Sequence, residues 1–178
     1  MRRLRPWPHD DRLHRLAQRI RSLAETDERR LRRVRDVEAA RRTAARDLHA
    51  VCADFVDAVN GVLEDRLVLL DPPEYSPAAY SDDAPNLVQI NVHGRILQVT
   101  YSATAELIST EDFRIPYILE GSVRAFNQEM LDKDLIEEQP LFYTMEGSRN
   151  MWRYFEARTY RSGPFDREYL TSVMEQIL

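Results

Sequence analysis

The side chains that could take part in chemistry are few and widely spaced. Of the four histidines, His9, His14, His49 and His93, only His49 shares a helical face with a cysteine, Cys52, three residues further on. A zinc site normally has three or four such ligands. Because no second pair exists, the sequence predicts no metal centre and places this pair at the edge of the core.

Nucleophilic catalysis and nucleotide binding also lack a motif. Cys52 falls on an apolar helical stripe, where a thiol packs and does not react. No serine stands in a Gly-x-Ser-x-Gly context, and the five glycines are isolated from one another, so no phosphate-binding loop is indicated. We therefore expect no catalytic residue and no cofactor, and we favour a protein that is not an enzyme.

One predicted strand combines aromatic and charged side chains. Alternation over residues 151–161 places five of them on one face: Trp152, Tyr154, Glu156, Arg158 and Tyr160. With Glu120 and Arg124 from a paired strand, this face could line a pocket for a small ligand or for acid–base catalysis. The other interpretation is a cross-strand ion pair on a solvated face.

A long helical segment precedes this predicted sheet. From His9 to Leu70 the chain has no proline and a single glycine, Gly61. Apolar residues recur in alternating steps of three and four, which predicts coiled-coil packing. They are Leu13, Leu16, Ile20, Leu23, Val34, Val37, Ala44, Leu48, Val51, Phe55, Ala58, Val62 and Leu69.

Four polar residues interrupt this spacing: Asp27, Arg30, Arg41 and Asp65. The first two lie close to Ser22 and Thr26, which resemble helix caps, so one long helix and a pair of helices both stay open. From Leu48 onward the apolar face widens, as expected of a helix packed on a sheet. We therefore predict a basic, arginine-rich helical arm over residues 1–45 and an acidic α+β domain over residues 46–178.

The rest of the chain predicts a mainly antiparallel five-stranded sheet with one inserted helix and a C-terminal helix. Residues 71–86 form a proline-rich acidic loop, and two alternating segments around Gly94 indicate a hairpin. Strands are expected near 117–125, 141–145 and 151–161, and helices at 127–138 and after the capping residue Asp166. This order of elements is similar to that of small secretion-chaperone-type α+β dimers and of several unrelated α+β modules, and no motif carries the likeness.

Charge is distributed unevenly along the chain. The first 50 residues carry 15 of the 25 basic residues and 8 of the 30 acidic ones. The lone Cys52 excludes an internal disulfide, no apolar segment follows the basic start, and the longest aliphatic run is only Leu67–Leu70. These features predict a cytoplasmic protein with no membrane partner.

The pattern favours a non-enzymatic module for protein–protein interaction or assembly, such as an adaptor, a chaperone-like protein or a complex subunit. Its partner would be a second copy or another protein, through an interface formed by Leu13, Leu16, Ile20, Leu23, Arg30, Val34, Val37 and Arg41. One alternative is nucleic-acid binding through the arginines of the arm, although acids are interleaved with them. The other alternative is a ligand-binding or enzymatic sheet domain with a pocket near Glu156 and Arg158.

Overall fold

The computed structural model describes residues 8–178, so the first seven residues of the predicted arm lie outside the described part. The helices are α1 (Pro8–Leu63), α2 (Gln128–Asp132) and α3 (Arg167–Glu175), with a short 3-10 helix η1 (Pro77–Ala79). The chain divides into two units, residues 1–39 and 40–178, and α1 contributes to both. No helix in the described residues is long and apolar enough to cross a membrane.

Helix α1 is continuous through the point at which two helices were the alternative. Thr26 does not cap a second helix there, because its Oγ1 donates to the backbone carbonyl of Ser22 one turn earlier, 2.8 Å away. The carboxylates of Glu25 and Glu28 pair with arginines four residues further on. Such pairs add a few tenths of a kcal/mol each to a helix, and no proline or glycine lies near this point to break it.

The helix ends at Leu63, earlier than the predicted end at Leu70. Glu64 has a positive φ of 54°, which turns the chain out of the helix. The side chain of Asn60 then holds the returning chain, since its Nδ2 donates to Val68 O at 2.8 Å and its Oδ1 accepts from Val68 N at 3.0 Å. This pair of hydrogen bonds sets the start of the first strand.

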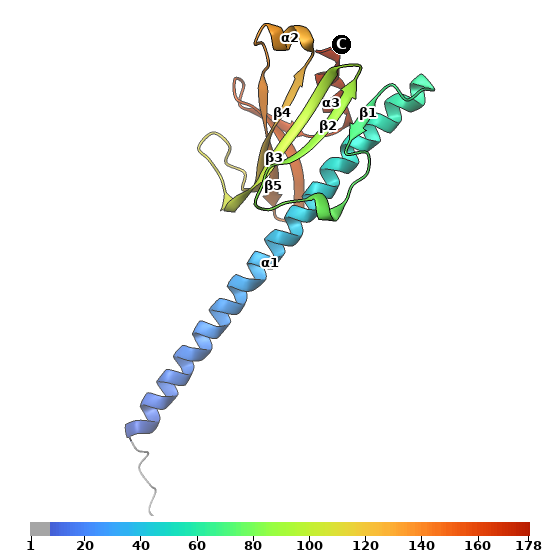
Figure 1. Cartoon of the computed structure of the whole chain (residues 1–178). Coiled ribbons are helices and arrows are strands. Elements are labelled where there is room, and N and C mark those ends of the chain that lie inside the picture. The colour runs from blue at the N-terminus through green and yellow to red at the C-terminus, as the bar shows by residue number, and fades with distance from the viewer. Residues whose placement is uncertain (1–7) are drawn as a thin grey trace, which may run out of the picture. The chain divides into compact units, whose positions relative to one another are not determined.

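The sheet has seven antiparallel strands, so the prediction of five is wrong, although the α+β class is confirmed. Strands follow one another in sequence order across the sheet, which is not closed (Figure 1). They are β1 (Leu69–Asp71), β2 (Asn86–Val92), β3 (Arg95–Ile108), β4 (Tyr117–Phe126), β5 (Glu138–Glu146), β6 (Arg149–Glu156) and β7 (Arg161–Pro164). The two strands that prediction missed, β1 and β7, are short and lie at the two edges.

The predicted strand over residues 151–161 is in fact two strands. β6 ends at Glu156, and a turn that includes Tyr160 with a φ of 55° leads into β7. Gly163 lies within β7 and pairs with Tyr154. A Cβ at Gly163 would come within 2.8 Å of the Tyr154 ring, so the close approach of β7 requires glycine. The predicted helix over 127–138 is likewise shorter, ending at Asp132.

The two faces of the sheet are covered differently. The α1 residues from 40 onward and α3 lie on one face (Figure 1). Strand residues such as Ile90, Val99 and Leu119 are buried. Near β6 on the other face, Phe113 stacks on Phe142 with ring centroids 4.5 Å apart, and Phe155 and Tyr117 join this cluster. Both faces around β6 are therefore filled by side chains.

The hairpin and the last helix follow their predicted local signals. β2 pairs with β3 around a turn in which Asn91 Oδ1 accepts from Gly94 N at 2.9 Å. Asp166 caps α3, with its Oδ1 accepting from Tyr169 N at 2.9 Å.

Candidate interaction surfaces

Six large aliphatic side chains form a stripe along the N-terminal unit of α1. They are Leu13, Leu16, Ile20, Leu23, Leu31 and Val34, and each is between 49 % and 63 % exposed. At 3.6 residues per turn, all six fall within an arc of about 80° on the helix surface. Aliphatic side chains gathered in this way on one face, and left in water, are typical of a surface that binds another helix.

The structure also places two charged residues on or beside the stripe. Asp27 lies near its middle, between Leu23 and Leu31, and Arg30 lies at its border. Leu31 was missed by the sequence analysis because strict steps of three and four select Arg30 instead. In a straight helix, which turns by about 100° per residue, a step of four residues from Asp27 leads to Leu31 on the same face. Following that step would have identified Leu31.

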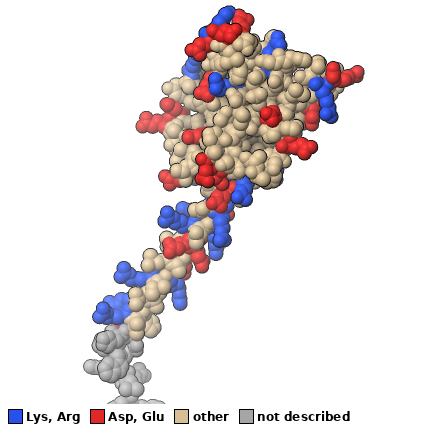
Figure 2. Space-filling model, in the orientation of Figure 1, with Lys and Arg blue, Asp and Glu red and all other residues tan. Residues whose placement is uncertain are grey.

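The charged residues are arranged asymmetrically around the stripe. Arginines line one border: Arg12, Arg15, Arg19, Arg30 and Arg33. The opposite border carries the small side chains of Ala17 and Ala24, with a single arginine, Arg35. Glu25 and Glu28 lie further round the helix, where they pair with Arg29 and Arg32 at 3.9 Å and 3.7 Å. Figure 2 shows basic side chains with interleaved acidic ones along this helical segment.

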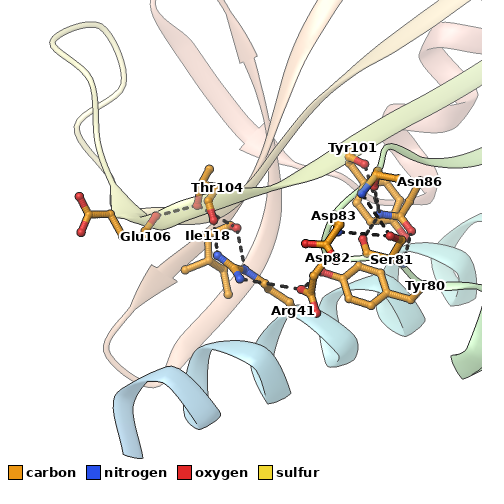
Figure 3. Close-up of polar contacts among 11 residues, drawn as sticks. Arg41, Tyr80, Ser81, Asp82, Asp83, Asn86, Tyr101, Thr104, Glu106 and Ile118 are labelled. Carbon is orange, nitrogen blue, oxygen red and sulfur yellow. Dashed lines mark hydrogen bonds and ion pairs between the residues drawn. The ribbon is translucent and has the colours of Figure 1, made fainter. Parts of the chain in front are cut away.

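Arg41, a predicted interface residue, is bound within the second unit. Only 11 % of its side chain is exposed. Its guanidinium donates to the carbonyl oxygens of Thr104 and Ile118, the latter at 3.3 Å from Nε, and lies 3.8 Å from Asp82 (Figure 3). A guanidinium that already has these partners has few donors left for another protein. Val37, another predicted interface residue, is half-buried.

Two of the predicted pocket residues pack against helices. Trp152 is buried, and its Nε1 donates to the carbonyl of Ala44 in α1 at 2.8 Å. Tyr154 stacks on Tyr169 of α3 with ring centroids 4.5 Å apart. Both aromatic side chains are thus occupied by packing between helices and sheet.

Glu156 and Arg158 lie at the edge of an open groove of about 620 Å³. The groove is formed by the segment after α2, by the turn after β6 and by α3, with Leu135 and Val173 among its apolar lining. Arg158 pairs with Glu137 at 2.9 Å, and Glu156 accepts a hydrogen bond from Thr159. The charges at this edge are therefore satisfied by near neighbours and do not converge on a common point.

Glu120 and Arg124 point to the opposite face of the sheet from buried Leu119 and Val123, as strand alternation requires. Arg124 lies 3.9 Å from Glu138 and over the ring of Phe126. The six predicted pocket residues are thus distributed over the core, the groove edge and the far face of the sheet, and the structure does not bring them together.

Cys52 and His49, the possible ligand pair in the sequence, are both buried in the second unit. Burial raises the pKa of the Cys52 thiol to about 12, so the reactive thiolate is strongly disfavoured. His49 is buried, with its Nε2 2.8 Å from Pro72 O and its ring beside that of Tyr75. Among the described residues, no three His, Cys, Asp or Glu side chains are grouped as a metal site.

Comparison of the chain with protein-family models, curated proteins and solved structures gave no match.

Proposed function

We propose that this protein is a non-enzymatic interaction module that associates with another protein chain through the N-terminal segment of α1. The observation that carries the proposal is the exposed stripe of six aliphatic side chains. Burying each of them against a partner helix would contribute about 2 kcal/mol, on the order of 10 kcal/mol in all before the cost of association. A cytoplasmic location and membership of a larger complex remain part of this proposal.

The charges beside the stripe support a protein partner over a nucleic acid. Between residues 8 and 39 there are nine arginines and seven acidic residues, so the local net charge is only +2. Charged residues that flank an apolar stripe in this way are typical of helix pairs, in which they determine orientation and partner choice.

The proposal is tested by placing charges on the stripe. Replacing Leu16→Asp and Ile20→Asp should weaken association at least about a hundredfold, because each change removes apolar burial and introduces a charge at the interface. Analytical ultracentrifugation over a concentration series measures this directly. Circular dichroism and thermal unfolding check that the sheet domain stays folded.

The matched control places the same charges on the other side of the helix. Gln18→Asp with Ser22→Asp keeps the spacing of four residues and the added charge of −2, but both residues are exposed and lie about 160° away from the first pair around the helix. This control should associate like the wild type. If the wild type itself is monomeric, or if both double variants lose association equally, the proposal is contradicted.

Nucleic-acid binding through the same segment remains the second candidate, because the arginines of residues 12–35 are exposed. It requires binding to duplex or single-stranded probes that falls steeply with salt. It also requires that exchanging Arg12, Arg15 and Arg19 for glutamine weakens binding, whereas the stripe variant does not. Absence of binding at low salt would exclude it.

A further inference from the structure

Two charged residues interrupt the apolar spacing near the middle of α1's N-terminal unit. Asp27 and Arg30 occupy two successive core positions of the alternating three-and-four spacing. Both are exposed, and within residues 8–178 neither side chain has an ion-pair partner, whereas Glu25 and Glu28 are paired along the helix. A helix that covers the stripe therefore meets Asp27 near its middle and Arg30 at its border, and pairing both charges favours its binding, since an unpaired buried charge is costly.

A second copy in the antiparallel orientation meets this requirement. In a parallel pair each core position faces the same position of the other helix, whereas in an antiparallel pair the first core position of a heptad faces the second. Asp27 and Arg30 hold these two positions. If the two-fold axis passes between residues 28 and 29, Asp27 of each copy faces Arg30 of the other, and symmetry makes the two ion pairs equivalent.

The same register matches the remaining core positions of the segment. Leu23 then faces Val34 of the second copy, and Ile20 faces Val37. Each pairing occurs twice because of the two-fold axis. Every core position from 20 to 37 thus faces a complementary residue, apolar with apolar and acid with base, although Val37 is already half-buried within its own chain.

The borders of the stripe are also compatible with this register. On one border, Ala24 lies beside Leu31 of the second copy, so a small side chain accommodates a large one. On the other border, Arg33 lies beside Thr26, and Arg19 lies beside Ala40. No arginine of the segment is placed against an arginine of the second copy.

Other arrangements of two copies leave the charges unsatisfied. A parallel pair in register places Asp27 against Asp27 and Arg30 against Arg30. An antiparallel pair shifted by one heptad places Asp27 against Leu23 or Val37, and its carboxylate then has no partner. Polar residues in a helix interface select orientation and register in this way, at some cost in affinity.

We propose that two copies of this chain pair through residues 20–37 of α1 as an antiparallel helix pair centred on reciprocal Asp27–Arg30 ion pairs. The paired segment is about 27 Å long. The inference rests on the proposed function, and it specifies the partner and the geometry of that same surface.

Charge reversal tests the reciprocal ion pairs. Asp27→Arg places an arginine opposite Arg30 of the other copy at both symmetry-related contacts. Arg30→Asp likewise places an aspartate opposite Asp27 at both contacts. Each single variant should weaken self-association about a hundredfold, as ultracentrifugation measures it. The swapped variant Asp27→Arg with Arg30→Asp should restore it, because the antiparallel register then pairs the same charges in reverse.

Two neighbouring substitutions control for net charge and for helix stability. Glu28→Arg and Arg29→Asp make the same charge changes away from the stripe, and each breaks one exposed ion pair along the helix. Exposed pairs of this kind contribute little. Both controls should therefore associate within about threefold of the wild type.

Disulfide formation tests orientation and register independently. An equimolar mixture of Leu23→Cys and Val34→Cys should cross-link between the two variants under mild oxidation. Either variant alone should not cross-link, because its two copies of the new cysteine lie about 16 Å apart along the antiparallel pair. The native Cys52 is fully buried and does not compete.

The outcomes separate this inference from the proposed function. If Leu23→Cys cross-links with itself, or if the swapped variant stays as weak as the single variants, the antiparallel inference is overturned. The proposed function survives that result as long as Leu16→Asp with Ile20→Asp abolishes association. A monomeric wild type contradicts both proposals.

Discussion

At the scale of single residues, Arg41 holds the point at which the ladder between β3 and β4 is interrupted. The register of the two strands shifts between Ala103 and Ile108, which frees backbone carbonyls at Thr104 and Ile118. The guanidinium of Arg41 donates to both carbonyls, and the carbonyl of Ile118 also accepts from Thr104 Oγ1 at 3.0 Å. Because unpaired buried carbonyls are costly, this arginine links α1 to the irregular part of the sheet.

Replacing Arg41→Met should therefore destabilise the protein by about 2 to 3 kcal/mol, because the methionine keeps the apolar stem but supplies no donor. Urea unfolding at neutral pH measures the loss. The neighbouring Arg42→Met is the control, since Arg42 is exposed, and it should change stability by less than about 0.5 kcal/mol. Equal effects of the two changes would show that the hydrogen bonds of Arg41 contribute nothing.

At the scale of elements, β3 and β4 approach each other so closely at Gly121 that a side chain has no room. A Cβ at this position would lie 2.1 Å from Thr100 O and 2.8 Å from Tyr101 Cα, both backbone atoms that cannot move aside. Gly61 in α1 has no neighbouring atom within 4 Å of the same position. A side chain therefore has no room at Gly121 in β4 but has free space at Gly61 in α1.

Gly121→Ala should destabilise the sheet by about 2 kcal/mol or more, because the added methyl forces the two strands apart. Gly61→Ala should instead stabilise α1 by about 0.5 to 1 kcal/mol, since alanine loses less backbone freedom in a helix. Urea midpoints of both variants give the comparison. A Gly121→Ala variant with the same urea midpoint as the wild type would contradict this close approach of β3 and β4.

At the scale of the whole molecule, α1 has two kinds of surroundings along one continuous helix. The residues from 40 onward supply Ala44, Leu48 and Cys52 to the core of the second unit. The residues before 40 expose their apolar stripe. One helix thus serves as a core element of the sheet domain and, in our proposal, as an interface.

The core of the second unit predicts how stability responds to alkaline pH. Burial raises the pKa of Cys52 to about 12 and raises the pKa values of Tyr101 and Tyr169 above their ordinary value of 10.0. Since these groups ionise more easily in the unfolded chain, their contribution to stability is complete below about pH 9 and is lost progressively above it. Urea midpoints should be constant from about pH 7 to 9 and should then fall, with tyrosinate absorbance appearing on unfolding. A midpoint that stays unchanged up to about pH 11 would contradict this.

Elements whose signals are local could be predicted from the amino-acid sequence. The absence of proline and the apolar spacing indicated α1, the segment around Gly94 indicated the hairpin, and Asp166 indicated the start of α3. In each case a helix or turn depends on residues only a few positions apart, so the pattern contains the physical cause.

The other features depend on contacts between segments that are far apart in the sequence. β1 and β7 are three and four residues long and exist because β2 and β6 pair with them, which no local pattern records. The burial of Arg41 and of the predicted pocket residue Trp152 could not be predicted for the same reason. The hydrogen-bond partners of both side chains lie more than 60 residues away in the chain. Side-chain type and spacing show which groups are on a face, whereas burial and partners depend on which other elements pack against it.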